Sequence, residues 1–359
     1  LGVLDTLQAA GVPSIRRARF TSGRPRTGSR RQLGSRTNRR DTSTDTTSQQ
    51  GPAVVTSRSG PDLRVSLPGA GLGVSRQLLD QTLIEQAAAV GAQVSLGADV
   101  RAVDPELGEV RWSGANGEIR VTQTPLILAA WGRRTRLDRS LGRRFLETSQ
   151  PFVGRKRHLR PVSPSAAVAL EESLGEVVEI HAFEGGYCGL NFVEGGRVNA
   201  CALLEQRWVD QLSDGSWETL DAALRRENYA LAERLEQLEP TESRPLAVAA
   251  VPFVPKDTGR GRLLYLGDAA GVVAPLVGDG QAMALESAER LVRLLATTDP
   301  QRLQEAWRRS FQRGFQTRLR WGRRLQNLTF RAAWSRRTIA LRRRTPPLAR
   351  WLTRLTRGR

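Results

Sequence analysis

The sequence predicts an α/β protein in which an open sheet with parallel strands is interrupted by a mostly antiparallel sheet and followed by a helical C-terminal region. Three observations predict this fold class. An apolar strand at 263–266 leads into a glycine-rich loop and then a helix, the building unit of open α/β sheets. Runs that alternate apolar and polar residues fill most of 150–260, as antiparallel strands do. Helical spacing of apolar residues covers 279–296 and most of 301–330.

The N-terminal part divides into two segments. Residues 1–13 have the pattern of the end of an apolar helix, with Gly11 and Pro13 as the stop. Residues 14–60 are rich in Arg, Ser, Thr and Gly and hold few large apolar groups, so we expect a mobile loop. Because Leu1 is not a methionine, we also expect the chain to begin inside a longer protein.

Ordered structure is predicted again over 61–149. Ser75 is a suitable N-cap for a helix that stops at Gly91. The run at 109–121 predicts a hairpin that turns at Asn116–Gly117. Residues 124–130 are a short apolar run that suits a buried parallel strand.

The rest of the chain completes the domain plan. Residues 150–255 form a second domain, a mostly antiparallel sheet with one amphipathic helix near 216–238. Residues 256–300 return to the first domain and carry its strand, loop and helix. Residues 301–359 form a basic helical C-terminal region.

Bulk composition excludes several classes of protein. The chain has 359 residues and is 39% apolar, enough for two domains with real cores. No apolar run approaches the ~18 residues of a transmembrane helix, and no secretory signal opens the chain. Cys188 and Cys201 cannot make a disulfide framework, which favours a reducing cytoplasm. With His158 and His181 as the only histidines, no zinc spacing occurs and no metal site is predicted.

The net charge of +19 is concentrated at the two ends of the sequence. Residues 14–60 carry eleven Arg against two Asp, and residues 301–359 carry eighteen Arg against one Glu. The body between them, 61–300, has a net charge of −6. The body of the chain is therefore mildly acidic, and the basic residues at the two ends call for a separate explanation.

The segment 262–292 carries the chemistry. Gly267 and Asp268 fall at the carboxyl end of its strand, where open α/β sheets bind ligands. Gly278 and Gly280 let the backbone approach a ligand closely. The following helix aims free amides and a partial positive charge at the same place, which suits an anionic ring or a phosphate. A plain glycine-rich turn is the alternative, and the length of the composite pattern disfavours it.

This segment resembles the second flavin-binding motif of the para-hydroxybenzoate-hydroxylase-like flavoproteins, a superfamily of aromatic monooxygenases, geranylgeranyl reductases and flavin-dependent halogenases. Residues 73–94 are similar to the family's serine–arginine helix, and 125–142 to its strand with the GADG motif. Residues 185–204 have a counterpart in the reductase-like members, and the resemblance spans most of 63–325.

The resemblance implies a Rossmann-like FAD-binding domain with an inserted substrate-binding sheet, 150–255. The family's N-terminal GxGxxG unit has no counterpart in this sequence, so the FAD-binding domain is expected to be incomplete at its N-terminus, with 1–13 as a remnant of one of its helices. Where the family has the Asp of GADG and a later Ser, this chain has Trp131 and Thr135.

FAD is the cofactor that the resemblance implies, with NAD(P)H as a candidate electron donor. The flavin performs the redox step itself, so no catalytic side chain is assigned. The resemblance and the loop pattern together place these residues in the flavin site: Arg76, Gly132, Gly267, Asp268, Pro275, Gly278, Asp279, Gly280 and Gln281. Asp279 has a second interpretation, the N-cap of the helix.

Four residues are candidates for the substrate side of the sheet: Lys156, His158, Tyr187 and Asn191. Each has a structural alternative. His158 also fits a surface or hydrogen-bonded histidine, and Tyr187 also fits a packed aromatic of a strand. We interpret His181, Cys188 and Cys201 as structural residues of buried strands.

The C-terminal region interleaves arginine with apolar residues, including Trp307, Phe311, Phe315, Trp334 and Trp351. The first interpretation is a helix that packs one apolar face on the core. The second is a basic amphipathic helix at the anionic inner face of a membrane. Nucleic-acid binding ranks last, because no nucleic-acid module accompanies the charge.

Taken together, the sequence predicts an FAD-dependent oxidoreductase, a reductase or monooxygenase that acts on an apolar or aromatic small molecule in the cytoplasm or at the inner membrane face. The alternative is a truncated, flavin-free relative that binds a membrane or nucleic acid. Fold alone does not choose the substrate, the electron donor or the oligomeric state.

Overall fold

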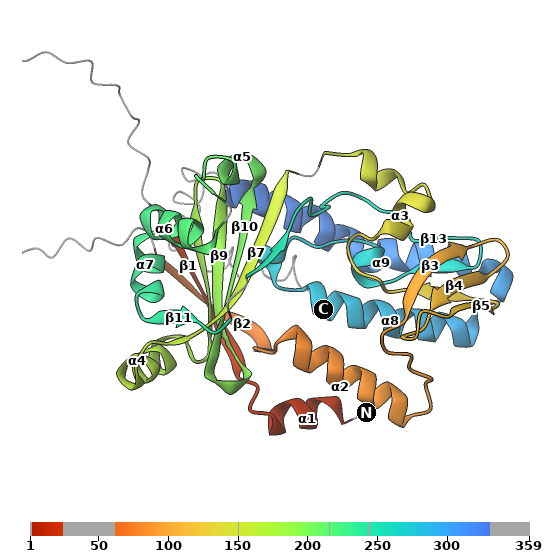
Figure 1. Ribbon diagram of the computed structural model, residues 1–359, viewed down its shortest axis with the longest axis horizontal. Coiled ribbons are helices and arrows are strands. Elements are labelled where there is room, and N and C mark those ends of the chain that lie inside the picture. The colour runs from red at the N-terminus through yellow and green to blue at the C-terminus, as the bar shows by residue number, and fades with distance from the viewer. Residues whose placement is uncertain (1, 24–61, 150, 215, 243–244, 331–359) are drawn as a thin grey trace, which may run out of the picture.

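The computed structural model describes residues 2–23, 62–149, 151–214, 216–242 and 245–330. Within them, a large sheet with helices on its outer face lies beside a second body of small sheets and long helices (Figure 1). The predicted α/β fold class is confirmed.

The large sheet has eight strands in the described part of the chain, in the order β11-β7-β10-β9-β8-β1-β2, with β12 also paired to β7. Neighbouring strands are antiparallel except β1 and β8, which run parallel. The strands are β1 (Ser14–Ser22), β2 (Asp62–Leu72), β7 (Phe152–Pro161), β8 (Val177–Phe183), β9 (Gly186–Val193), β10 (Arg197–Glu205), β11 (Leu238–Pro240) and β12 (Leu246–Val248).

Helices cover the outer face of this sheet, on the left in Figure 1. The main core lies there, where apolar residues of β8, β9 and β10 meet Leu170, Leu224 and Leu231 from three helices. The helical segments of this part are α4 (Pro164–Leu174), η2 (Glu194–Gly196), α5 (Gln206–Val209), α6 (Trp217–Glu227) and α7 (Tyr229–Leu235). The single helix predicted near 216–238 is thus two helices.

Asn228 explains that break. Its side chain caps α7 by accepting a hydrogen bond from the amide of Leu231 at 3.2 Å. Its Nδ2 donates to the carbonyl of Ala182 and to the hydroxyl of Thr21, both at 3.1 Å. A cap residue needs non-helical backbone, so the helix must stop and restart there.

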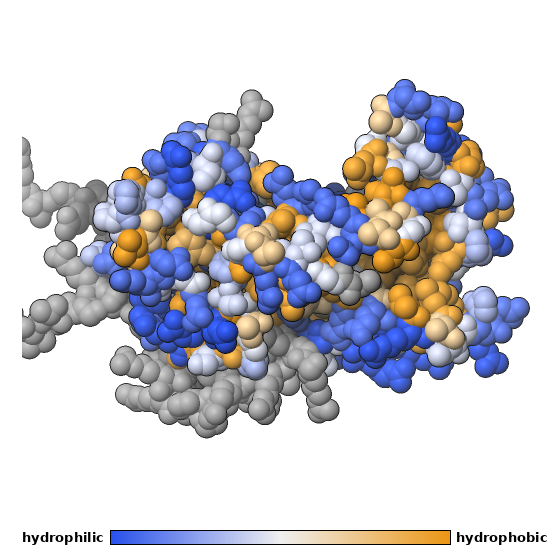
Figure 2. All heavy atoms as spheres, turned by 90° about the horizontal axis from the view of Figure 1, so that it is seen from below, coloured by the Kyte–Doolittle hydropathy of each residue, from blue (hydrophilic) through white to orange (hydrophobic). Residues whose placement is uncertain are grey.

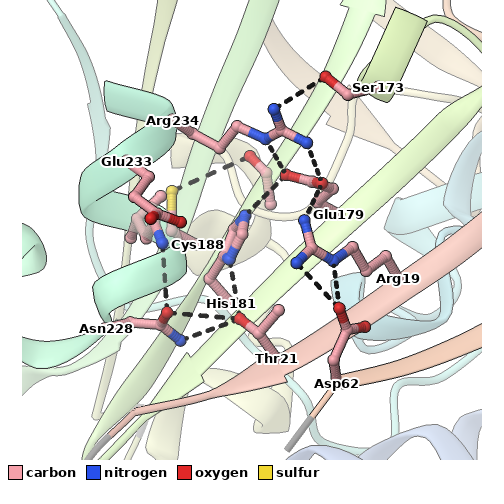
Figure 3. Close-up of polar contacts among 12 residues, drawn as sticks. Arg19, Thr21, Asp62, Ser173, Glu179, His181, Cys188, Asn228, Glu233 and Arg234 are labelled. Atoms are coloured by element: carbon pink, nitrogen blue, oxygen red, sulfur yellow. Dashed lines mark hydrogen bonds and ion pairs between the residues drawn. The ribbon is translucent and has the colours of Figure 1, made fainter. Parts of the chain in front are cut away.

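The prediction of a mobile loop over 14–60 is wrong for residues 14–22, which form β1 in the interior of the sheet. Within the described residues of this stretch, Arg16, Arg17 and Arg19 each form an ion pair. Arg19 forms ion pairs at 2.9 Å with Asp62 of β2 and with the fully buried Glu179 of β8 (Figure 3). Residues 24–61 lie outside the described residues.

A second difference concerns the domain boundary at 150. Residues 62–72 were expected to belong with the FAD-binding part, but as β2 they pair with β1 in the large sheet. The chain therefore contributes strands to the large sheet before residue 150 as well as after it, so the sheet is built from both sides of that boundary.

The second body contains the parallel pair that the sequence predicts. Strand β14 (Leu263–Tyr265) lies parallel to β6 (Ile127–Ala129) and antiparallel to β13 (Gly259–Arg260). A separate antiparallel sheet consists of β3 (Asp99–Asp104), β4 (Glu109–Ser113) and β5 (Ile119–Gln123). The hairpin predicted to turn at Asn116–Gly117 is the β4–β5 connection, with Gly117 at a φ of 81°.

The helices of the second body are α1 (Val3–Ala9), α2 (Arg76–Ala89), α3 (Arg136–Ser140), η1 (Arg144–Glu147), η3 (Gly267–Ala269), η4 (Pro275–Val277), α8 (Gly280–Thr297) and α9 (Pro300–Thr329). Ser75 caps α2 as predicted, accepting from the amide of Leu78 at 3.1 Å. Seen from below in Figure 2, this part of the molecule gathers hydrophobic side chains around a hollow on the right.

Helix α9 packs its apolar face on the core, the first of the two interpretations of the basic C-terminal region. Trp307, Phe311 and Phe315 are buried, and the indole of Trp307 donates to the carbonyl of Tyr265 at 3.1 Å. Within 300–329 this face is covered by protein. Trp334 and Trp351 lie outside the described residues. Among the residues that the structure describes, no helix is long and apolar enough to cross a membrane.

Candidate functional site

A groove of about 1400 Å³ runs between the inner face of the large sheet, the helices α1 and α2, and the start of α8. It brings together six of the residues that the sequence singled out: Arg76, Lys156, Asn191, Gly278, Asp279 and Gln281. They come from four different elements and from the loop before α8. Apolar residues of α1, α2, β2 and α8 line the rest of the groove.

The start of α8 faces this groove because of Gly278. Its φ of 69° is in the left-handed region that favours glycine, and it ends η4 so that α8 can begin at Gly280. A Cβ on Gly278 would meet nothing within 4 Å, so the backbone here is open to a ligand. The bond from the Met283 amide to the Asp279 carbonyl, at 2.8 Å, begins the helical ladder and leaves earlier amides for other partners.

Gly267 lies where the end of β14 meets α8. Its φ is 53°, and a Cβ on it would lie 3.1 Å from the Cβ of Ala284 on α8. Its amide donates to the hydroxyl of Ser287 at 3.0 Å. Gly267 therefore packs the end of β14 tightly against α8, which fixes the helix relative to the strand.

Positive charge surrounds Asp268 at the end of the strand. Burial raises the pKa of the Asp268 carboxyl, and the charges of Lys256, Arg133 and Arg76 work against that rise. Lys256 donates to the carbonyls of Asp268 at 2.7 Å and Arg133 at 2.6 Å. Burial, with the nearby charge of Arg143, lowers the pKa of Lys256 to about 8.

Arg143 holds the same turn from the other side. Its guanidinium donates to the carbonyl of Ala269 at 2.8 Å and to the carboxylate of Asp138 at 2.9 Å. It also lies 3.7 Å from the ring centroid of Tyr265. Sequence reasoning missed both Arg143 and Lys256, because each bonds backbone carbonyls of residues far along the chain, which no residue pattern reveals.

Three polar residues of the sheet line the groove, from β7, β9 and β10. Asn199 of β10 stands opposite Asn191 of β9, and its Nδ2 donates to the Oδ1 of Asn191 at 3.2 Å. The Oδ1 of Asn199 is buried and has no hydrogen-bond partner. Asn199 was not predicted, although its place across the sheet from Asn191 is the signal that could have found it. Lys156 of β7 completes this side.

Comparison with known protein families shows to which family the chain belongs. Residues 1–302 match the model of a family described as an FAD binding domain. The chain belongs to this FAD-binding family. It is therefore a member of an FAD-dependent flavoenzyme group, as the second flavin motif predicted. No curated protein matches the chain.

Solved structures share the fold of this FAD-binding protein. The myxobacterial chondrochloren halogenase CndH, an FAD-dependent enzyme, is 17% identical with a TM-score of 0.68 over 99% of this chain and 78% of its own. The flavin-dependent brominase Bmp2 is 12% identical with a TM-score of 0.70 over 99% and 79%. The halogenase PltM, solved with phloroglucinol and FAD, is 14% identical with a TM-score of 0.58 over 98% and 71%.

The groove of this FAD-binding protein fits a flavin. Small-molecule sites commonly have volumes of roughly 300–1000 Å³, so about 1400 Å³ leaves room for a tricyclic ring and its side chain. A helix start and Arg76 supply positive potential, and Asn199 offers a buried acceptor without a partner. Arg76 is exposed and bonds Asp80 on its own helix at 2.9 Å, so it can turn to a ligand at little cost.

The other predicted residues lie outside the lining of the groove. Pro275 is exposed in η4, and a Cβ on Gly280 would contact Val273 of the loop at 3.7 Å. Gly132 has a φ of 83° and follows Trp131, whose ring meets Tyr265 edge-on at 5.7 Å between centroids.

His158 and Tyr187 are the two substrate candidates that the groove does not include. His158 is within 3.2 Å of the Glu242 carboxylate through its Nδ1. Tyr187 is 3% exposed and packs against Phe330 at 5.9 Å between centroids, and burial raises its pKa. Both therefore fit the structural alternatives given for them.

Proposed function

We propose that this chain is an FAD-dependent reductase or monooxygenase whose flavin ring lies in the groove at the start of α8. The single observation that carries the proposal is the meeting of six residues, chosen from separate sequence segments, along one groove. A bound flavin would supply the redox chemistry, with NAD(P)H as the proposed electron donor.

The chain's own residues would hold and polarise that ring. The free amides in the first turn of α8 would hydrogen-bond the electron-rich edge of the ring and stabilise negative charge that develops there. Arg76 would supply a cation near the flavin's polar chain. Gly267, packed on α8, and the pair Arg143 and Lys256 would keep the turn after β14 in a fixed position.

The sheet side of the groove would bind the substrate. Lys156, Asn191 and Asn199 present charge and amide groups toward it, which suits a small molecule with a polar substituent. The apolar lining from α2 and β2 would contact an apolar or aromatic body and exclude water. These features support an apolar or aromatic substrate with one polar end.

A flavin titration tests the binding part of the proposal. Adding the full chain to FAD should quench flavin fluorescence in a saturable way, and Arg76→Met should weaken binding about tenfold through the loss of one charge-assisted contact. The control is Arg111→Met, which removes an exposed arginine paired to Glu109 on the separate sheet. Equal FAD affinity in both variants would remove Arg76 from the site.

Product analysis tests the reaction. The flavin-loaded chain is given NAD(P)H and aromatic or unsaturated substrates, with and without oxygen. Oxygen-dependent hydroxylation assigns a monooxygenase, and anaerobic double-bond reduction assigns a reductase. A halogenated product that needs added halide would overturn both assignments in favour of halogenation, the activity in the names of the solved relatives.

A further inference from the structure

Arg318 is a buried cation on α9 that the groove does not include. It is 7% exposed and follows Phe315 by one helical turn, on the face that packs against the core. One turn later, a Cβ on Gly322 would lie 3.2 Å from Val277, so α9 there is in close contact with the loop before α8. A buried guanidinium is costly unless it is paired, so its partners identify what it does.

Arg318 bridges two carboxylates at the start of α8. Its Nη1 lies 2.7 Å from the Oε2 of Glu286 and 3.3 Å from the Oδ2 of Asp279. Glu286 also accepts from Arg290 at 2.7 Å. Burial works to raise the pKa of Glu286, but hydrogen bonds from Arg318 and Arg290 outweigh it and lower the pKa. The lowered pKa favours the charged form of Glu286, which is therefore an anionic partner for Arg318.

Asp279 is the N-cap of α8, but it does not behave as one. Its side chain makes no hydrogen bond to the helix, whereas six other cap residues in the described part of the chain each accept one from a first-turn amide: Ser75, Thr135, Ser163, Ser216, Asn228 and Asp299. Aspartate is among the strongest capping residues, so its carboxylate would normally occupy those amides. Instead, the Asp279 carboxylate is paired with Arg318 of α9.

We propose that Arg318 is a positioning residue for the flavin site: it holds the Asp279 carboxylate away from the start of α8 and so keeps the first-turn amides available for the flavin ring. The inference rests on the proposed function, which places the ring at those amides. Without Arg318, the carboxylate would cap the helix, compete with the flavin for the same donors and add a negative charge beside it.

A rescue experiment tests this role. FAD affinity is measured by fluorescence quenching for the full chain, Arg318→Met, and the double variant Arg318→Met/Asp279→Gly. Arg318→Met should bind FAD about tenfold more weakly, the factor expected for loss of roughly one capping-strength hydrogen bond. The double variant should return to within about threefold of the unmodified chain, because no carboxylate remains to compete. Arg309→Met, on the exposed face of α9, is the control.

FAD binding of the double variant, and of a second single variant, distinguishes a positioning role from a merely structural one. A merely structural role would leave the double variant as weak in binding as Arg318→Met, and that result would overturn the inference. So would a folded Arg318→Met chain that binds FAD normally. If Arg318→Met does not fold, Asp279→Asn is used; it can still cap α8 but no longer attracts Arg318, and should bind several-fold more weakly. Unchanged binding there would also overturn the inference. If the unmodified chain binds no FAD, the proposed function fails as well.

Discussion

Replacing Glu179 by glutamine tests the ion network that holds β1 in the large sheet. The Glu179 side chain is fully buried and accepts hydrogen bonds at 2.9 Å from Arg19 and from both the Nε and Nη2 of Arg234 (Figure 3). His181 lies 3.2 Å away on the same strand. Glu179→Gln removes the charge that both guanidinium groups share, with almost no change in volume.

The expected loss in the free energy of unfolding follows from the partners that Arg19 and Arg234 keep in Glu179→Gln. Arg19 keeps Asp62, but Arg234 keeps only the hydroxyl of Ser173 at 2.9 Å. Removing one partner of a buried ion pair costs about 3–5 kcal/mol. The two guanidinium side chains are 19% and 12% exposed, so water compensates in part. We therefore expect the free energy of unfolding to fall by about 3 kcal/mol, the lower end of that range.

Urea denaturation followed by tryptophan fluorescence measures this loss. The matched control is Glu176→Gln, which breaks an ion pair with Arg16 whose side chains are 61% and 49% exposed, and should cost at most about 1 kcal/mol. Two equal and small losses would contradict this prediction, because they would mean that the buried network contributes no more than a surface ion pair.

Three further predictions concern other parts of the fold. Because burial, with the charge of Arg143, lowers the pKa of Lys256 from 10.5 to about 8, the unfolded chain binds more protons between those values. The stability should therefore rise with pH from 8 to 10.5 by about 3 kcal/mol, and urea curves of Lys256→Met should lack that rise. Gly267→Ala should cost about 2–3 kcal/mol in thermal unfolding, since it adds a contact with Ala284 to the cost of positive φ; Gly142→Ala, which meets nothing within 4 Å, should cost only about 1 kcal/mol, and equal losses would contradict the packing role. Asn228→Ala removes the α7 cap and two buried bonds, so about 2–3 kcal/mol should be lost in urea, and a loss below about 0.5 kcal/mol would show that the helix break does not depend on it.

Local patterns in the sequence predicted the elements that depend on neighbouring residues. The cap at Ser75, the turn at Asn116–Gly117 and the unit that joins β14 to α8 each follow from a few adjacent residues, and each is present. The second flavin motif was specific enough to identify the family, which the match over 1–302 confirms.

Features that depend on distant residues were not predictable in the same way. Strand β1 looked like a charged loop because its counter-charges, Asp62 and Glu179, come from strands far along the sequence. Alternation placed Lys156 and His158 on one face of β7, but could not reveal that Glu242 contacts His158 while Lys156 reaches the groove.

The role of Arg318 was hidden for the same reason. Eighteen arginines in 301–359 made the region look uniformly basic, and only the fold shows which of them meets Asp279. Asp279 itself had two interpretations in the sequence, a helix cap or a residue near the flavin. The structure places it in the groove lining and also gives it the cap position without a cap hydrogen bond.

A crystal structure of the full chain with FAD would show whether the flavin lies in the groove at the start of α8. We expect the isoalloxazine ring in the groove, with its polar edge about 3 Å from the amide nitrogens that begin α8 near Gly280 and Gln281. Flavin bound elsewhere on the protein, with those amides directed to protein atoms, would contradict the account.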